Sequence, residues 1–116
     1  MEVVIYHNPR CSKSRQTLQL LEEKGIQPKI VKYLDETLSV ETLKELYSQL
    51  KLTSVRDMMR TKEALYKELN LADSSLSDEQ LFMAMANNAK LIERPIVVAN
   101  GQAKHGRPPE QVLEIL

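Results

Sequence analysis

A predicted strand, a loop and the start of a helix follow one another in the segment Val3-Val4-Ile5-Tyr6-His7-Asn8-Pro9-Arg10-Cys11-Ser12-Lys13-Ser14-Arg15. Its first four residues are β-branched or aromatic, which is typical of a short buried strand. Beyond it, Thr17, Leu18, Leu20 and Leu21 recur at helical spacing. Cys11 is therefore expected at the N-terminus of a helix. Unsatisfied N–H groups and the helix dipole favour a thiolate there and can also receive an anion.

The charges around this cysteine favour a reactive thiol. Arg10, Lys13 and Arg15 lie within four residues of Cys11, and Arg15 shares its helical face. Nearby cations lower the pKa of a thiol. A lone cysteine packed in the core is the alternative, but a loop position among three cations indicates a nucleophile.

The composition is that of a globular protein whose charges balance, so it has no strong overall electrostatic field. The 116 residues fit one domain, and 16 basic residues balance 16 acidic ones, so no nucleic-acid partner is expected. No apolar run reaches the roughly 20 residues of a membrane span, so no membrane association is expected either. One cysteine and two distant histidines predict neither a disulfide framework nor a metal site. We expect a cytoplasmic monomer, because the cytoplasm keeps a reactive thiol reduced.

The first third of the chain predicts a β-α-β unit. The helix that follows Cys11 should end near Gly25, a residue suited to the C′ position. Residues 28–34 alternate well enough for a second strand. A right-handed crossover would make this strand parallel to the first.

The middle of the chain is predicted to be helical. Three helix starts are expected, at Ser39, at Thr53 or Ser54, and at Ser77, where Gln80 completes a capping box. Residues 64–71 continue the helical material. The side chains expected to face the core are Leu43, Leu46, Tyr47, Leu50, Val55, Met58, Met59, Leu81, Met85 and Ala86. This region, approximately 38–90, is interpreted as an insertion into a single domain of residues 1–116.

The last part of the chain predicts a hairpin and a helix. Residues 96–99 give the strongest strand pattern, and Asn100-Gly101 after them is typical of a tight turn. Residues 102–105 should return as an antiparallel edge strand. Pro108 or Pro109 fits the first turn of a final helix. Its inward residues are expected to be Val112, Leu113 and Leu116.

Two arginines stand beside prolines in predicted loops. Arg94 precedes Pro95 and the strongest strand, and Arg107 lies between Gly106 and Pro108. Loops on a rigid scaffold commonly present functional groups. Singly, each arginine would more often be a solvated charge. With Arg60, however, they form a set of planar, permanently charged groups suited to an oxyanion.

These residues resemble a known family, the glutaredoxin-linked arsenate reductases of the ArsC type in the thioredoxin superfamily. The resemblance covers nearly the whole chain. The segments that carry it are Tyr6-His7-Asn8-Pro9-Arg10-Cys11 with Ser14-Arg15, Met59-Arg60, Glu93-Arg94-Pro95-Ile96-Val97-Val98 and Gly106-Arg107-Pro108.

The resemblance implies an α/β thioredoxin-like fold, with a mixed four-stranded sheet and an inserted helical subdomain. It implies that Cys11 is catalytic and that the Pro95 peptide bond is cis. It further implies that Arg60, Arg94 and Arg107 hold an arsenic oxyanion. His7, Ser14 and Arg15 would support the thiolate.

The lone cysteine also bears on the source of electrons. Ser14 occupies the position where a dithiol oxidoreductase carries its second cysteine, so electrons must come from outside the chain. We expect glutathione as co-substrate, no bound cofactor, and glutaredoxin as the partner that clears a Cys11–glutathione mixed disulfide.

Two alternatives remain open. Spx-type regulators share this fold with its insertion and bind RNA polymerase, so Cys11 could be a redox sensor. The chain could also be a monothiol glutathione-dependent oxidoreductase without arsenate activity. The three arginines favour the arsenate reductase, because a sensor needs no set of oxyanion ligands.

Overall fold

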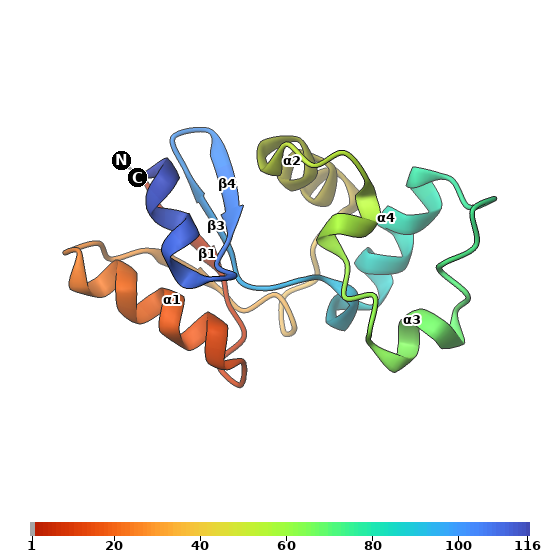
Figure 1. Cartoon of the computed structure of the whole chain (residues 1–116), viewed down its shortest axis with the longest axis horizontal. Helices are drawn as coiled ribbons and strands as arrows, with labels where there is room; N and C mark the ends of the chain where they lie inside the picture. Colours follow the sequence, from red (N-terminus) through yellow and green to blue (C-terminus); the bar gives the residue numbers. More distant parts are fainter. Residues whose placement is uncertain (1) are drawn as a thin grey trace. The chain divides into compact units, whose positions relative to one another are not determined.

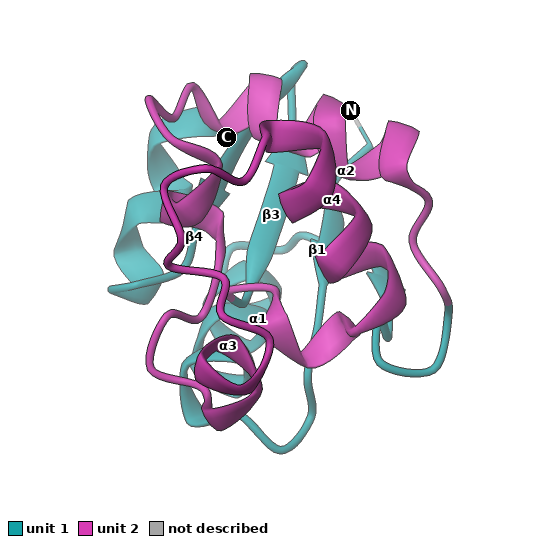
Figure 2. Cartoon of the chain, turned by 90° about the vertical axis from the view of Figure 1, so that its right-hand side faces the viewer, with its two compact units in different colours: residues 1–36, 94–116 teal, residues 37–93 magenta. Residues whose placement is uncertain are grey.

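The computed structural model describes residues 2–116, which fall into two compact units. One unit combines residues 1–36 and 94–116, and the other consists of residues 37–93 (Figure 2). In sequence, the second unit is thus inserted between the two halves of the first. Its limits lie close to the predicted 38–90. That both units form one thioredoxin-like domain stays a prediction.

The first unit is built on a four-stranded sheet in the order β2-β1-β3-β4. Its strands are β1 (Val4–Tyr6), β2 (Lys29–Val31), β3 (Ile96–Ala99) and β4 (Gln102–His105). β1 pairs with β2 in parallel and with β3 antiparallel, with Ile5 opposite Ile30 and Val97. The predicted α/β class with a mixed four-stranded sheet is confirmed. β2 is shorter than the predicted residues 28–34.

The hairpin between β3 and β4 turns at Asn100 and Gly101, as the sequence predicts. Both residues have positive φ, 55° and 73°, which is the conformation required at the centre of a tight hairpin turn. β4 pairs antiparallel with β3 and forms one edge of the sheet. The strand pair ends with His105 opposite Ile96, so Pro95 and Gly106 are neighbours just beyond it. The Gly106 N–H donates a hydrogen bond of 3.0 Å to the Pro95 carbonyl.

α1 (Ser12–Glu23) follows β1 and begins immediately after Cys11. Gly25, with φ +77°, stands just after its end, as predicted. The fully buried residues of this helix are Ser14, Thr17 and Leu21, while Leu18 and Leu20 are only partly buried. Two polar side chains therefore occupy the buried face at the end of the helix that carries Cys11.

The C-terminal η3 (Pro109–Ile115) packs against α1 (Figure 1). It is a 3₁₀-helix rather than the expected α-helix. In it Val112 and Ile115 are buried, whereas the predicted Leu113 and Leu116 are only partly buried. A 3₁₀-helix turns every three residues, which places the residue three positions after Val112 on the same face. Together β1, α1, β3 and η3 enclose a core made of Val3, Ile5, Leu21, Val97, Ala99, Val112 and Ile115.

The second unit, residues 37–93, is helical. It contains α2 (Val40–Leu50), η1 (Val55–Met58), α3 (Ala64–Glu68), α4 (Asp78–Asn87) and η2 (Ala89–Leu91). The predicted caps are confirmed. Ser39 accepts the Thr42 N–H, Ser54 accepts the Arg56 N–H, and Ser77 and Gln80 form a complete capping box. In α4, Phe82 is buried while the predicted Ala86 is only partly so. The ring of Phe82 meets that of Tyr47 edge-on at 5.7 Å.

Across residues 2–116, none of the helices has both the length and the apolar character that crossing a bilayer requires.

Candidate active site

Cys11 occupies the N-cap position of α1, with extended backbone dihedrals. Its side chain is 8% exposed. Burial raises the pKa of this thiol, but the Ser14 N–H, the charge and hydrogen bond of Arg94, and the Lys13 N–H together outweigh burial. The net result is a pKa below that of an ordinary thiol. This direction of the pKa supports the predicted thiolate character of Cys11, which stays a prediction.

Arg94 is the cation that acts directly on Cys11. Its guanidinium stabilises the thiolate both through its charge and through a hydrogen bond to the sulfur. Arg94 is half-buried and comes immediately before Pro95, which is buried and directly precedes β3. The Arg94–Pro95 peptide bond is cis, and so is the bond between Arg107 and Pro108.

Arg107 is linked to Arg94 through the main chain. Its Nη1 donates a hydrogen bond of 3.1 Å to the Arg94 carbonyl. The preceding Gly106 is buried, and a Cβ added there would collide with the Thr17 side chain and lie 2.9 Å from Cγ of Pro95. The loop that carries Arg107 therefore approaches α1 and Pro95 more closely than any residue with a side chain would permit.

His7 and Ser14 form a buried polar pair behind the loop. Nδ1 of His7 lies 2.6 Å from Oγ of Ser14, which also accepts the Asn8 N–H at 3.0 Å. Burial lowers the pKa of His7, and the charges of Lys32 and Arg15 lower it further, so its imidazole is neutral near pH 7. The roles predicted for His7 and Ser14 divide accordingly. The Ser14 N–H lowers the pKa of Cys11, whereas His7 contacts the Ser14 hydroxyl.

The loop between β1 and α1 is closed by its own hydrogen bonds. The Cys11 N–H donates to the Asn8 carbonyl, and the Arg10 N–H donates to Oδ1 of Asn8, both at 3.0 Å. Arg15 Nη1 donates to the Pro9 carbonyl at 3.1 Å. Arg15 therefore fixes the loop, and its predicted support of the thiolate stays a prediction. Asn8 was not among the predicted site residues, although an Asn-Pro pair after a strand is a recognised turn signal.

Arg60 belongs to the helical unit. Its Nη1 forms a 3.0 Å salt bridge with Glu63, and its N–H donates to the Leu91 carbonyl at 2.7 Å. The structure brings Cys11, Arg94 and Arg107 together within the first unit. The oxyanion-binding role of Arg60 stays a prediction.

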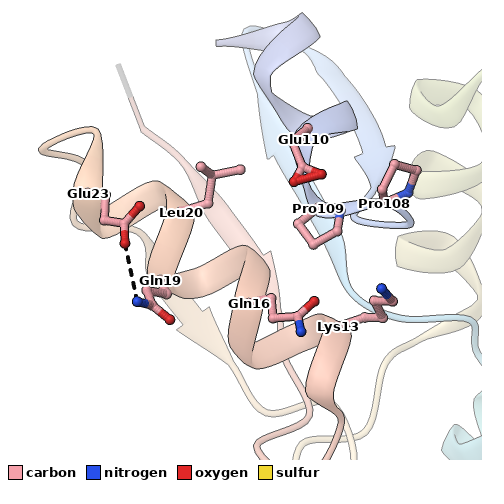
Figure 3. A pocket seen from close by; sticks show the side chains of 8 residues that line it. All are labelled: Lys13, Gln16, Gln19, Leu20, Glu23, Pro108, Pro109 and Glu110. Carbon is pink, nitrogen blue, oxygen red and sulfur yellow. Dashed lines mark hydrogen bonds between the residues drawn. The ribbon is translucent and has the colours of Figure 1, made fainter.

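Two cavities lie within the first unit. One, of about 350 Å³, is lined by residues 7–10 of the loop together with Lys32, Leu34 and Asp35. The other, of about 360 Å³, lies between α1 and the start of η3. Figure 3 shows its lining side chains, which include Lys13, Gln16, Glu23 and Glu110. The first cavity shares its wall with the loop that leads into Cys11.

Among residues 2–116, His, Cys, Asp and Glu side chains do not gather in threes that could hold a metal ion. The chemistry that the described site offers is that of an activated sulfur nucleophile beside a guanidinium, with a second guanidinium one hydrogen bond further on. A substrate suited to it has an electrophilic central atom surrounded by oxygens that carry negative charge.

Comparison with known proteins places this site in a family. A family model described as the ArsC family matches residues 6–115, a span that includes Cys11, Arg94 and Arg107. The chain belongs to the ArsC family. A relative, the uncharacterised protein YfgD of Escherichia coli K12, is 63% identical over 99% of this chain and 97% of its own length. A protein of Haemophilus influenzae named arsenate reductase is 57% identical over the full length of both chains.

A solved structure extends the likeness to the fold. The arsenate reductase from Vibrio cholerae superposes with a TM-score of 0.99 and 72% identity, covering 100% of this chain and 98% of that one. The resemblance stated from the sequence motifs is therefore confirmed at the level of the ArsC family and its thioredoxin-like fold.

Proposed function

We propose that this protein is an arsenate reductase in which Cys11 is the nucleophile and glutathione supplies the electrons. One observation carries the proposal: Cys11 lies at the N-terminus of α1, where the Arg94 guanidinium lowers the pKa of its thiol. An activated thiolate and a fixed cation meet at one point, as nucleophilic attack on an anion requires. The names of the relatives in Haemophilus influenzae and Vibrio cholerae support arsenate as that anion.

In the first step the Cys11 thiolate attacks arsenic(V). A sulfur–arsenic bond forms, and one arsenate oxygen takes up protons and leaves as water. Both partners are negatively charged, so a cation must offset their repulsion. We assign this role to Arg94, whose guanidinium lowers the pKa of Cys11, and to Arg107, which donates to the Arg94 carbonyl.

In the second step a glutathione thiolate attacks the Cys11 sulfur. A disulfide bond forms and the sulfur–arsenic bond breaks. Its electron pair stays on arsenic, which becomes arsenic(III) and departs as arsenite. Cys11 is left as a mixed disulfide with glutathione. Cys11 is the one cysteine of the sequence, and Ser14 stands three residues later where a second cysteine would resolve the mixed disulfide.

In the third step a glutaredoxin thiolate attacks the glutathione sulfur and releases the Cys11 thiolate. A second glutathione then restores the glutaredoxin, so that two glutathione molecules are oxidised for each arsenate reduced. This cycle suits the cytoplasm, where glutathione is kept reduced. Arg60 is proposed as a third oxyanion ligand, and His7, Ser14 and Arg15 as the groups that hold the loop around the thiolate.

The experiment is arsenate-dependent oxidation of NADPH in a coupled assay with glutathione, glutaredoxin and glutathione reductase. We expect turnover with the native chain and none with Cys11→Ser, because serine is a far weaker nucleophile of similar volume. Thioredoxin with its reductase should sustain turnover poorly in place of glutaredoxin. Efficient turnover with thioredoxin alone would contradict the proposed electron route. Absence of arsenate turnover would contradict the function itself and move the redox-sensor or monothiol oxidoreductase alternatives ahead.

A further inference from the structure

The cavity beside the Cys11 loop has an unusual set of charges for its size. Arg10 and Lys32 supply two cations to its lining, and Asp35 supplies one carboxylate. Pro9 and Leu34 add apolar surface, and Leu34 is left 46% exposed. A volume of about 350 Å³ lies within the range of small-ligand sites, which is about 300–1,000 Å³.

The three charged side chains of this lining have no partner of opposite charge among the described residues. The side chains of Arg10, Lys32 and Asp35 enter no ion pair or hydrogen bond with another of residues 2–116. His7 also belongs to the lining, and because its lowered pKa keeps it neutral near pH 7, it adds no charge to the cavity. The cavity therefore presents two cations and one anion to whatever enters it.

The cavity is also close to the reactive sulfur along the chain. Its wall is formed by residues 7–10, and the carbonyl of Asn8 in that wall accepts the Cys11 N–H at 3.0 Å. Arg10, the last residue of this wall, directly precedes Cys11 in the chain.

We propose that this cavity binds the thiol co-substrate, a small peptide with two carboxylates and one ammonium group, the charge pattern of glutathione. Arg10 and Lys32 would pair with the two carboxylates and Asp35 with the ammonium. Pro9 and Leu34 would cover the aliphatic part of the peptide. The inference rests on the proposed glutathione-dependent function and assigns the residues that select the electron donor.

The second cavity fits such a ligand less well. Its charged lining residues are Lys13, Glu23 and Glu110, which amount to one cation and two anions (Figure 3). A peptide with two carboxylates would meet net repulsion there. Variants of Glu110 therefore test this alternative location.

The test uses disulfide exchange and contains no arsenate. The Cys11 thiolate attacks oxidised glutathione. The glutathione disulfide bond breaks, a Cys11–glutathione disulfide forms, and a glutathione thiolate leaves. The rate is followed by intact-protein mass spectrometry and divided by the rate with neutral hydroxyethyl disulfide. This ratio cancels any change in the intrinsic reactivity of Cys11.

Charge reversal in the cavity should lower this ratio. We expect Arg10→Glu and Lys32→Glu each to lower it by about three- to tenfold, because an exposed attraction is replaced by a repulsion of similar size. Lys29→Glu is the matched control. Lys29 is an exposed lysine of β2 outside the cavity lining, so its reversal should leave the ratio nearly unchanged.

Asp35→Asn separates a specific site from general charge attraction. The disulfide of mercaptopropionate carries the same net charge as oxidised glutathione but no ammonium. If Asp35 holds the ammonium, Asp35→Asn should slow oxidised glutathione by about two- to fivefold. The same substitution should leave the rate of exchange with the mercaptopropionate disulfide unchanged or raise it, because for this ligand it removes only a repulsive charge.

Three results would overturn the proposal. The first is a rate ratio that is unchanged in both Arg10→Glu and Lys32→Glu. The second is an equal change in the rates of oxidised glutathione and of the mercaptopropionate disulfide in every variant. The third is an increase in the rate with oxidised glutathione that occurs only in Glu110→Lys, which would place the ligand in the second cavity. Because no arsenate is present, the cavity assignment can fail while arsenate turnover holds. It can equally stand if arsenate turnover fails.

Discussion

Nδ1 of His7 lies 2.6 Å from Oγ of Ser14, and this buried contact joins the end of β1 to the first turn of α1. The same Ser14 oxygen accepts the Asn8 N–H, while the Ser14 N–H stabilises the Cys11 thiolate. Ser14 thus holds the loop through its hydroxyl and lowers the pKa of Cys11 through its N–H. It stands where a dithiol enzyme has its second cysteine, so the chain has a structural clamp in place of a resolving thiol.

Removing this clamp should destabilise the protein. Ser14 is fully buried, and Ser14→Ala leaves His7 Nδ1 and the Asn8 N–H without their partner. An unsatisfied buried polar group costs about 1–3 kcal/mol, so the free energy of unfolding should fall by about that amount. Urea denaturation measures it. Ser12→Ala, at an exposed position two residues earlier, is the control and should change little. An equal effect of both substitutions would contradict the clamp.

The same pair predicts a loss of stability in acid. Because the pKa of folded His7 is lowered by burial and by Lys32 and Arg15, the unfolded chain takes up a proton on this histidine first as the pH falls. Stability should therefore decline as the pH drops below about 6.5, the ordinary histidine value. Urea denaturation at pH 7.5 and at pH 5.5 would compare the native chain with His7→Gln. The variant should lose less stability on acidification, and a parallel loss in both proteins would assign the effect to other groups.

Arg94 should control the ionisation of Cys11. Arg94→Ala removes both a charge and a hydrogen bond from the thiolate, so the pKa of Cys11 should rise. The pH dependence of alkylation by iodoacetamide, a neutral reagent, measures this pKa. Arg107→Ala is the companion variant. Arg107 contacts the Arg94 carbonyl and is not among the groups that lower the Cys11 pKa, so the alkylation profile should shift little.

Arsenate kinetics should show a different division among the arginines. Charged hydrogen bonds contribute roughly 1.5–3 kcal/mol, so Arg94→Ala and Arg107→Ala should each lower kcat/KM for arsenate by about ten- to a hundredfold. Arg60→Lys should keep part of the activity, because a point charge still offsets the negative adduct. Unchanged arsenate kinetics in all three variants would contradict the proposed oxyanion ligands.

Gly106 should tolerate no side chain. The Cβ of Gly106→Ala would collide with Thr17 and approach Cγ of Pro95, so the loop that carries Arg107 has to move. We expect a lower Tm and a higher KM for arsenate. Thr17→Ala removes the hydroxyl that the new Cβ meets, so the double variant should recover part of the loss. A double variant that is no better than the sum of the two single ones would mean that Thr17 is not the obstacle.

Local sequence signals predicted the elements well wherever the chemistry is local. Ser77 and Gln80 form their capping box, and Asn100 and Gly101 make the turn. Each of these depends on side chains a few residues apart. Both members of such a signal are therefore visible in one short stretch of sequence.

Features that depend on tertiary packing could not be read in this way. Phe82 is buried against Tyr47, a partner 35 positions away, and a helical pattern alone pointed to Ala86. The final helix is a 3₁₀-helix, and Ile115 is therefore buried in place of Leu116. At the site, the cation that acts on Cys11 is Arg94, which is 83 positions further along the chain, while the adjacent Arg15 binds the Pro9 carbonyl. The sequence could supply the arginines but not their order around the sulfur.

A single turnover without glutaredoxin measures directly whether Cys11 reduces arsenate with electrons from glutathione. The reduced protein is mixed with arsenate and glutathione, and the products are followed by intact-protein mass spectrometry and arsenic speciation. The proposed route predicts one glutathione bound per chain through Cys11 and one arsenite released with it. Cys11→Ser should give neither product, and omission of arsenate should abolish both in the native chain. Arsenite formation without the Cys11–glutathione disulfide, or no arsenite at all, would contradict the account.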